Sequence, residues 1–355
     1  MNLETKINSS VIGADSCRKF IKKVLEKLGA PTSIATRWAE LLVETSLLGF
    51  DSHGIRMLER YVKHINSGGI KISAKPKITS QQHACISMDA RGGLGHIAAD
   101  RATSIAIKKA KKFGLSCVTV KNGNHVGACG LYARKAASED YIGICTTVSR
   151  PTMAPWGGKT ALLGSNPIAI CAPVKDKPNF LFDTASTVVA MGKITAAYDR
   201  NKRIPDTWAL DKNGWPTTDP AAAITGTLFP IGGHKGYGLA MGFEILSSLL
   251  SGGMFSSQVE SWIQQTKKST GASFTVIVLD ISAFQDVALF KRRMKLWVEL
   301  LTTSSKRPGF DRIYYPGEIE AEKHSYRLKH GISVSVQEID MFDRLAARFN
   351  IKKPR

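Results

Sequence analysis

The sequence lacks the patterns that mark several large classes of protein. No apolar run approaches the roughly 20 residues needed to cross a bilayer, and the polar start, Met1 to Ser10, has no apolar signal core. The six cysteines are scattered, without a C-x-x-C pair. The histidines show no H-x-x-x-H spacing, and no paired carboxylates accompany them. We therefore expect a cytoplasmic protein with reduced cysteines, no membrane span and no metal site.

Two common nucleotide-binding motifs are also missing. There is no Walker A sequence, and the nearest approach to G-x-G-x-x-G, Gly92-Gly93-Leu94-Gly95, has the wrong spacing. A conventional Rossmann site is therefore not supported.

Positive charge is abundant: 49 Lys and Arg residues face 29 Asp and Glu residues, a net charge of +20. Such an excess can indicate nucleic-acid binding. The basic residues are dispersed, however, with small groups near the ends or middles of expected helices, as at 108–112 and 291–295. No zinc finger, basic zipper or aromatic RNA-binding stripe accompanies them. We do not expect nucleic acid as the main partner, although a basic binding protein on an enzyme fold stays an alternative.

The order of patterns predicts two regions and an α/β fold. Residues 1–75 read as helical, with helices over 14–29, 33–50 and 55–67, and residues 305–355 return to join them. Residues 76–304 alternate between helical and strand-like patterns, which predicts an α/β domain with a lid-like loop near 200–230. Expected strands are 85–89, 116–120, 142–148, 167–172, 180–183 and 274–279, and expected helices are 97–113, 131–138, 237–251 and 287–302.

Two histidine motifs are the first candidates for chemistry. Asp51-Ser52-His53-Gly54 places an imidazole beside a hydroxyl and a carboxylate at the end of an apolar helix. Asn124-His125-Val126-Gly127 directly follows a buried strand, and such strand ends are where α/β proteins bind ligands. Either histidine could instead be an ordinary structural residue.

Further candidates lie in glycine-rich or polar segments. The Gly164-Ser165-Asn166-Pro167 stretch could cradle phosphate or form tight turns, and Asp183 could cap the next helix or orient a catalytic group. At Gly232 to Gly238, four glycines and Lys235 open a helix, which favours an anion.

Taken together, these motifs resemble the non-Rossmann malate/L-lactate dehydrogenase family, which also contains ureidoglycolate and sulfolactate dehydrogenases and the diketogulonate and cyclic-ketimine reductases. The similarity extends from about residue 14 to about residue 335. It rests on the ordered matches Asp51-Ser52-His53-Gly54 with Arg56 and Tyr61, Asn124-His125-Val126-Gly127-Ala128, Pro155-Trp156-Gly157-Gly158, Gly164 to Pro167, Asp183-Thr184-Ala185, Ile204 to Ala209, Pro216 to Pro220, Gly232 to Gly238 and Pro316-Gly317-Glu318.

The resemblance implies an NAD- or NADP-dependent oxidoreductase that interconverts a small 2-hydroxy acid of the malate or lactate type and its 2-keto acid, working as a homodimer. A ureidoglycolate-type dehydrogenase and a 2-keto acid or imine reductase are the alternatives. Members of the family are described with either the first or the second histidine as the proton-transfer residue, here His53 or His125. We assign proton transfer to His53 with Ser52, and a second polar contact to the reacting oxygen to His125. Arg56 could hold the substrate carboxylate or be a surface ion-pair partner. The resemblance also implies that residues 76–304 are the cofactor-binding domain and contain a mixed sheet. Cofactor binding is assigned to Ser149, Asp183, Thr184, Ala185, His234, Lys235, Gly317 and Glu318.

Overall fold

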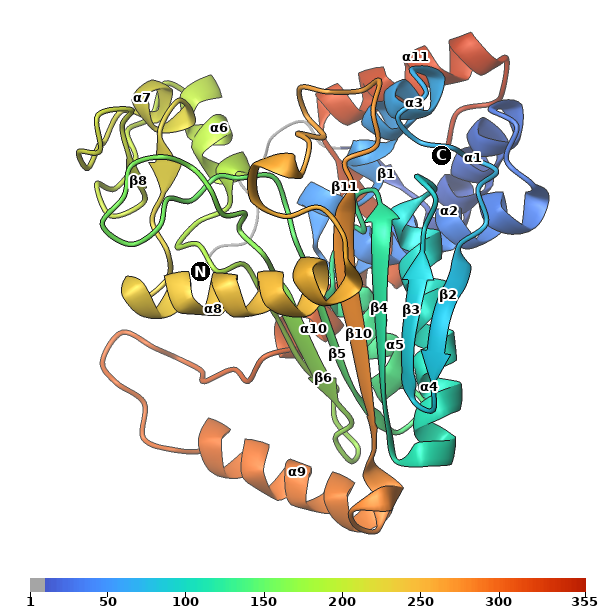
Figure 1. Ribbon diagram of the computed structural model, residues 1–355, viewed down its shortest axis with the longest axis vertical. Coiled ribbons are helices and arrows are strands. Elements are labelled where there is room, and N and C mark those ends of the chain that lie inside the picture. Colours follow the sequence, from blue (N-terminus) through green and yellow to red (C-terminus); the bar gives the residue numbers. More distant parts are fainter. Residues whose placement is uncertain (1–9) are drawn as a thin grey trace.

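Figure 1 shows the fold of the chain as a computed structural model, which describes residues 10–355. The prediction that the chain is not exported rests on Met1 to Ser10, which lies, except for its last residue, outside the described part. Within residues 10–355, no helix combines the length and the apolar character required to cross a membrane.

The centre of the fold is a seven-stranded mixed sheet. Only β3 and β4 are parallel, and every other neighbouring pair in this sheet is antiparallel. Each expected strand overlaps an observed one, so the predicted α/β fold with a mixed sheet is confirmed. In spatial order the strands are β2 (Lys77–Gln82), β3 (Cys85–Asp89), β4 (Leu115–Gly123), β10 (Ala272–Asp280), β5 (Tyr141–Thr147), β6 (Ile168–Ala172) and β7 (Phe180–Thr184).

The insertion of β10 between β4 and β5 brings distant segments to one edge of the sheet. Ala272 at the start of β10 pairs with Gly123 at the end of β4, and Phe274 pairs with Thr147 at the end of β5. The start of β6 and the end of β7 lie at the same edge, since Ile168 is in register with both Thr146 and Thr184. We call this edge, where β4, β5 and β7 end and β6 and β10 begin, the site edge.

Helices cover both faces of the sheet (Figure 1). On one face lie α4 (Gly95–Phe113) and α5 (Gly130–Ala137), and α8 (His234–Glu244), continued by a π-helical turn at Ile245–Leu249, crosses the other. The inner face of α4 consists of small side chains, which let the helix lie close to the strands. These fully buried alanines are Ala98, Ala99, Ala102, Ala106 and Ala110.

A second core joins the two ends of the chain. The helices α1 (Ala14–Lys27), α2 (Thr32–Leu47) and α3 (Leu58–Asn66) bury their apolar faces together with α11 (Val336–Phe349), and Phe20 meets Phe342 edge to face. Beside them, β1 (Ser10–Ile12) pairs with β11 (Ile332–Val334), and α10 (Glu318–His330) precedes β11. The region boundaries given above stay a prediction.

Three local predictions were wrong. The chain does not open with helices alone, because Ser10–Ile12 form a strand whose partner is more than 300 residues away. The third helix begins at Leu58 rather than at Ile55, after two 3-10 turns at Asp51–His53 and Ile55–Met57. The long helix starts at His234, three residues before its expected start, because Gly232 and Gly233 adopt positive φ and end the preceding turn.

The segment near 200–230 has structure of its own. Between α6 (Met191–Asp199), which the sequence pattern did not indicate, and α8 lie β8 (Ala209–Leu210), α7 (Pro220–Ile224) and β9 (Thr227–Leu228). A small core around Ile194, Ile204 and Leu228 holds them together. The remaining helix, α9 (Val287–Thr302), matches its expected range.

All six cysteines are free thiols. Cys145 and Cys171 are buried as expected, whereas Cys117 is only half-buried. Burial raises the pKa of the Cys171 thiol to about 12, so this group stays protonated.

Candidate active site

A cavity of about 400 Å³ lies at the site edge. Six segments form its wall: the 3-10 turns after α2 with the start of α3, the loops that follow β4 and β5, the segment before β6, the start of α6, and the loop that precedes β10. Its polar and aromatic lining includes Ser52, His53, Arg56, Arg60, His125, Ser149, Arg150, Glu260 and Trp262.

The first histidine is held by a tight turn against α2. The Ser46 hydroxyl accepts a hydrogen bond from the Ile55 amide at 2.9 Å. A Cβ on Gly54 would lie 2.0 Å from the same oxygen, so only glycine fits there. The turn exposes the Ser52 hydroxyl, whose oxygen lies 2.8 Å from Nδ1 of His53.

Asp51 does not face His53. Its carboxylate accepts hydrogen bonds from both terminal nitrogens of Arg327 on α10, at 2.6 and 3.1 Å. The carboxylate of the motif therefore anchors the turn to the C-terminal part of the chain, and the hydroxyl is the motif's polar contact to the imidazole.

The second histidine follows β4 in a loop fixed by a buried amide. Nδ2 of Asn124 donates to the carbonyls of Gly92 and Gly93, each at 3.0 Å, and its Oδ1 accepts from the Thr270 amide. On the cavity side, the Tyr61 hydroxyl lies 2.6 Å from Nδ1 of His125. One ring nitrogen of His125 is therefore held by a side chain of α3.

The imidazoles of the two motifs stack on each other. The ring centroids of His53 and His125 are 5.3 Å apart with planes inclined by 19°. The indole of Trp262 lies at 4.6 Å and 10° from His125. Stacking of this kind restricts ring rotation and keeps the imidazoles aligned in the cavity wall.

Both histidines are neutral near pH 7. Burial lowers the pKa of His53, and burial together with the charge that His53 would carry lowers the pKa of His125 well below 6.5. Because protonation of one ring disfavours protonation of the other, the pair holds at most one proton in this range. Burial raises the pKa of Tyr61, which keeps its hydroxyl proton.

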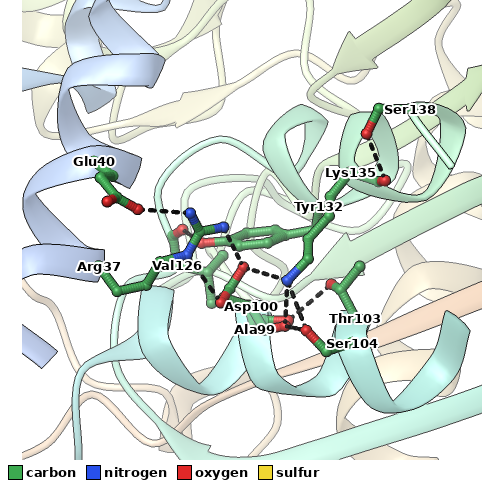
Figure 2. Close-up of polar contacts among 10 residues, drawn as sticks. All are labelled: Arg37, Glu40, Ala99, Asp100, Thr103, Ser104, Val126, Tyr132, Lys135 and Ser138. Atoms are coloured by element: carbon green, nitrogen blue, oxygen red, sulfur yellow. Dashed lines mark hydrogen bonds and ion pairs between the residues drawn. The ribbon is translucent and has the colours of Figure 1, made fainter. Parts of the chain in front are cut away.

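A partly buried polar network supports the His125 loop from behind (Figure 2). The Tyr132 hydroxyl donates to the Val126 carbonyl. Beside it, Asp100 accepts from Arg37 at 2.8 Å and from Lys135 at 2.7 Å. Although burial alone would raise the pKa of Asp100, these two cations hold it below its usual value. The charged network ties α2, α4 and α5 together under the loop.

Known proteins match nearly the whole length of this chain, in sequence and in structure. The family model described as malate/L-lactate dehydrogenase matches residues 12–342. The chain belongs to the malate/L-lactate dehydrogenase family. It is 38% identical to the malate dehydrogenase of Pyrococcus horikoshii over 95% of each chain, and 36% identical to the L-sulfolactate dehydrogenase of Methanocaldococcus jannaschii over 91% and 93% of the two chains. The crystal structure of malate dehydrogenase from Entamoeba histolytica matches with a TM-score of 0.93 at 31% identity, covering 98% of this chain and 100% of that one.

The predicted resemblance and the predicted non-Rossmann fold are thereby confirmed, and the chain is a dehydrogenase. Of its predicted site residues, the structure brings His53, Ser52, His125, Arg56 and Ser149 into the wall of one cavity. Arg56 also lies 3.6 Å from Glu338, so it is already one half of an ion pair.

Four predicted cofactor residues of the dehydrogenase lie at or beside the site edge but outside the cavity. Thr184 ends β7 and Ala185 follows it, and the next amide, of Ser186, donates to the Ser165 carbonyl. His234 and Lys235 open α8 and are exposed. The Ile231 amide donates to the Ser186 carbonyl, which places the start of α8 near the same edge.

Three other predicted residues have structural partners. Asp183 accepts from the Gly130 amide at 2.7 Å, so it caps α5, an earlier helix, and not the helix that follows it. Burial raises the pKa of Asp183 to about 6. Gly317 packs against the start of β7, and Glu318 bonds Arg312 at 3.0 Å. A role of these residues toward the cofactor stays a prediction.

Sequence reasoning gave no role to several residues of this wall. Tyr61, which contacts His125 from outside the cavity wall, could have been assigned, because it is among the matches that carry the family resemblance. Trp262 and Arg150 carried no such signal, since each reaches the cavity from a loop whose position depends on the sheet.

Proposed function

We propose that this dehydrogenase uses NAD or NADP to interconvert a small 2-hydroxy acid, of the malate or lactate type, and its 2-keto acid. The single observation that carries the proposal is the pair of neutral, stacked imidazoles of His53 and His125 in one cavity with arginine side chains. A neutral imidazole can take the proton of a hydroxyl, and a guanidinium binds a carboxylate through two parallel hydrogen bonds.

In the proposed mechanism, His53 is the acid/base. Ser52 holds Nδ1 of the ring, which leaves Nε2 for the substrate hydroxyl. His125, held at Nδ1 by Tyr61, contacts the same oxygen and stabilises the charge that develops there. Arg56 contacts the carboxylate next to the reacting carbon.

The nicotinamide cofactor supplies hydride transfer to or from that carbon. The residues present fit such a group. The half-buried Ser149 borders the cavity with its hydroxyl beside Ser165. The helix α8 presents an exposed N-terminus with Lys235 in its first turn, which suits a diphosphate. Asp183, Thr184 and Ala185, and also Gly317 and Glu318, stay in the proposal as cofactor residues on the family resemblance.

We also propose that the dehydrogenase is a homodimer in the cytoplasm. In support of dimerisation, α8 and α9 expose large apolar side chains that a monomer would leave in water. The most exposed are Leu239 on α8, Ile245, Leu249 and Leu250 in and just after the π-helical turn that continues it, at 51–57%, and Leu296 and Leu300 on α9, at 66% and 70%.

Substitution of the two histidines tests the proposed reaction. We expect His53→Ala and His125→Ala each to lower kcat by about 10²–10⁴-fold, since each removes a group that handles the substrate oxygen. The measurement is NAD(P)H absorbance with malate, lactate and their 2-keto acids, together with cofactor binding by fluorescence. His330→Ala, an exposed histidine on α10, is the matched control and keeps full activity. Unchanged turnover in both site variants, with cofactor still bound, would show that the assignment is wrong.

The proposed role of His53 also predicts how kcat/KM for oxidation depends on pH, which the same assay measures. Oxidation needs a neutral base, and burial lowers the pKa of His53 below 6.5. The kcat/KM for oxidation should therefore stay constant as pH falls to about 6.5 and decline only at more acidic pH. A decline that begins above pH 7 would contradict a buried, neutral His53 as the base.

A further inference from the structure

Arg150 is a cation in the cavity wall that has no side-chain partner among residues 10–355. It follows Ser149 in the loop after β5, lines the cavity and is half-buried. Within residues 10–355 its guanidinium takes part in no ion pair and no side-chain hydrogen bond. Burial lowers the pKa of this guanidinium, as expected where no anion offsets the loss of water.

The other charged groups of the wall are already engaged. Arg56 pairs with Glu338 at 3.6 Å, and the guanidinium of Arg60 lies over the Trp262 ring at 5.5 Å. The carboxylate in the wall, Glu260, faces Lys268 at 3.9 Å. The cavity therefore has more positive than negative charge, and the uncompensated cation comes from a different wall than Arg56 and Arg60.

A half-buried guanidinium without a partner is costly to maintain, and an incoming anion recovers that cost through charge-assisted hydrogen bonds. We propose that Arg150 forms a second anion subsite and that the preferred substrate is a 2-hydroxy acid carrying another anionic group, a carboxylate or a sulfonate, on C3. Arg56 takes the carboxylate next to the reacting carbon, and Arg150 takes the group on C3. This inference rests on the proposed function.

Lactate and malate separate the two subsites, because they share the reacting carbon and its carboxylate but only malate has an anionic group on C3. Sulfolactate then distinguishes a sulfonate from a carboxylate at the same position. The decisive variant is Arg150→Met, which keeps the length of the side chain and removes its charge. Arg150→Lys restores the charge, and Arg101→Met, an exposed arginine on α4, is the matched control.

We expect the wild-type enzyme to prefer malate or sulfolactate to lactate. Arg150→Met should lower kcat/KM for these dianions by about 10–100-fold and change that for lactate by less than about 3-fold, as loss of a charged hydrogen-bonded pair predicts. Arg150→Lys should recover part of the loss. In calorimetry without turnover, the Kd of succinate should rise by about 10-fold in Arg150→Met, and that of propionate should not change.

Other outcomes would overturn the inference. If Arg150→Met lowered kcat/KM equally for lactate and malate, or raised the KM for NAD(P), Arg150 would have a structural role or contact the cofactor instead. The proposed function would still hold in that case, provided that the wild type oxidises a 2-hydroxy acid. If the wild type oxidised no 2-hydroxy acid at all, the proposed function itself would fail and the inference with it.

Discussion

At the scale of single residues, the surroundings of each histidine determine what it can do. His53 and His125 each have one ring nitrogen held by a hydroxyl and open into a cavity. His96, at the start of α4, is fully buried beside them, and neither of its ring nitrogens has a hydrogen-bond partner in the described chain. Burial lowers the pKa of His96 to about 3. It packs against Gly127, where a Cβ would lie 2.5 Å from its Nε2.

Burial of His96 leads to a prediction about how the free energy of unfolding depends on pH. Its pKa is about 3 in the folded protein and 6.5 when unfolded, so between these values the unfolded chain binds the extra proton and stability falls as pH falls. Removing the imidazole with His96→Leu, of similar volume, should make the loss of unfolding free energy between pH 8 and pH 5 smaller by about 2 kcal/mol.

Urea unfolding at the two pH values measures this difference. His330→Ala, which changes an exposed histidine on α10, serves again as the control. An identical pH dependence in His96→Leu and in the wild type would mean that the folded protein can protonate His96 freely.

At the scale of elements, the site depends on loops that the sheet aligns. The loops after β4 and β5 and the loop before β10 meet because β10 lies antiparallel to both neighbours. Polar contacts then fix each loop: Asn124 for the His125 loop, and Asn166, whose Oδ1 accepts from the Ser149 amide at 3.2 Å. Asp183, which the sequence suggested as a cap, caps α5 under the same loops.

The hydrogen bond from the Tyr132 hydroxyl to the Val126 carbonyl can be tested by its effect on stability and kcat. Tyr132→Phe would leave the buried Val126 carbonyl without its partner, which typically costs about 1–3 kcal/mol. We expect that loss of unfolding free energy in urea and a several-fold lower kcat, because the His125 loop loosens. Tyr141→Phe, at the start of β5, is the control, since the Tyr141 hydroxyl makes no hydrogen bond within the described chain. Wild-type stability and kcat in Tyr132→Phe would mean that the loop does not depend on this contact.

At the scale of the whole molecule, the exposed apolar faces of α8 and α9 predict how two chains meet. Replacing Leu296 and Leu300 together by Glu would place two charges in the proposed dimer interface. We expect the variant to have half the wild-type mass in light scattering while keeping its helical content. Arg101→Glu, an exposed change on α4 and outside the proposed interface, should stay dimeric. A wild-type protein that is monomeric, or a double variant that still dimerises, would contradict the proposal.

Much of the fold could be predicted from residue patterns. Short β-branched runs and helical periodicity located six of the seven strands of the main sheet and the helices around it, because burial of alternate or every third to fourth residue leaves a local signal. Both histidine motifs were found from their residue types and their places at the end of a helix and of a strand. The strands β1 and β2 and the helix α6 were missed. In β1 three residues show no period and their partner β11 is distant, and β2 is a mostly exposed edge strand.

By itself, the sequence determined the α/β class, the family and the two histidines, because these depend on local order along the chain. Only the tertiary structure decided which side chains share a cavity. The placement of β10 between β4 and β5 brings Trp262 onto His125 and Arg150 into the same wall, and Asp51 is directed to Arg327 instead of His53. The physical reason is that burial and partners, which set both the pKa of a histidine and the charge of a cavity, arise between segments far apart in the chain.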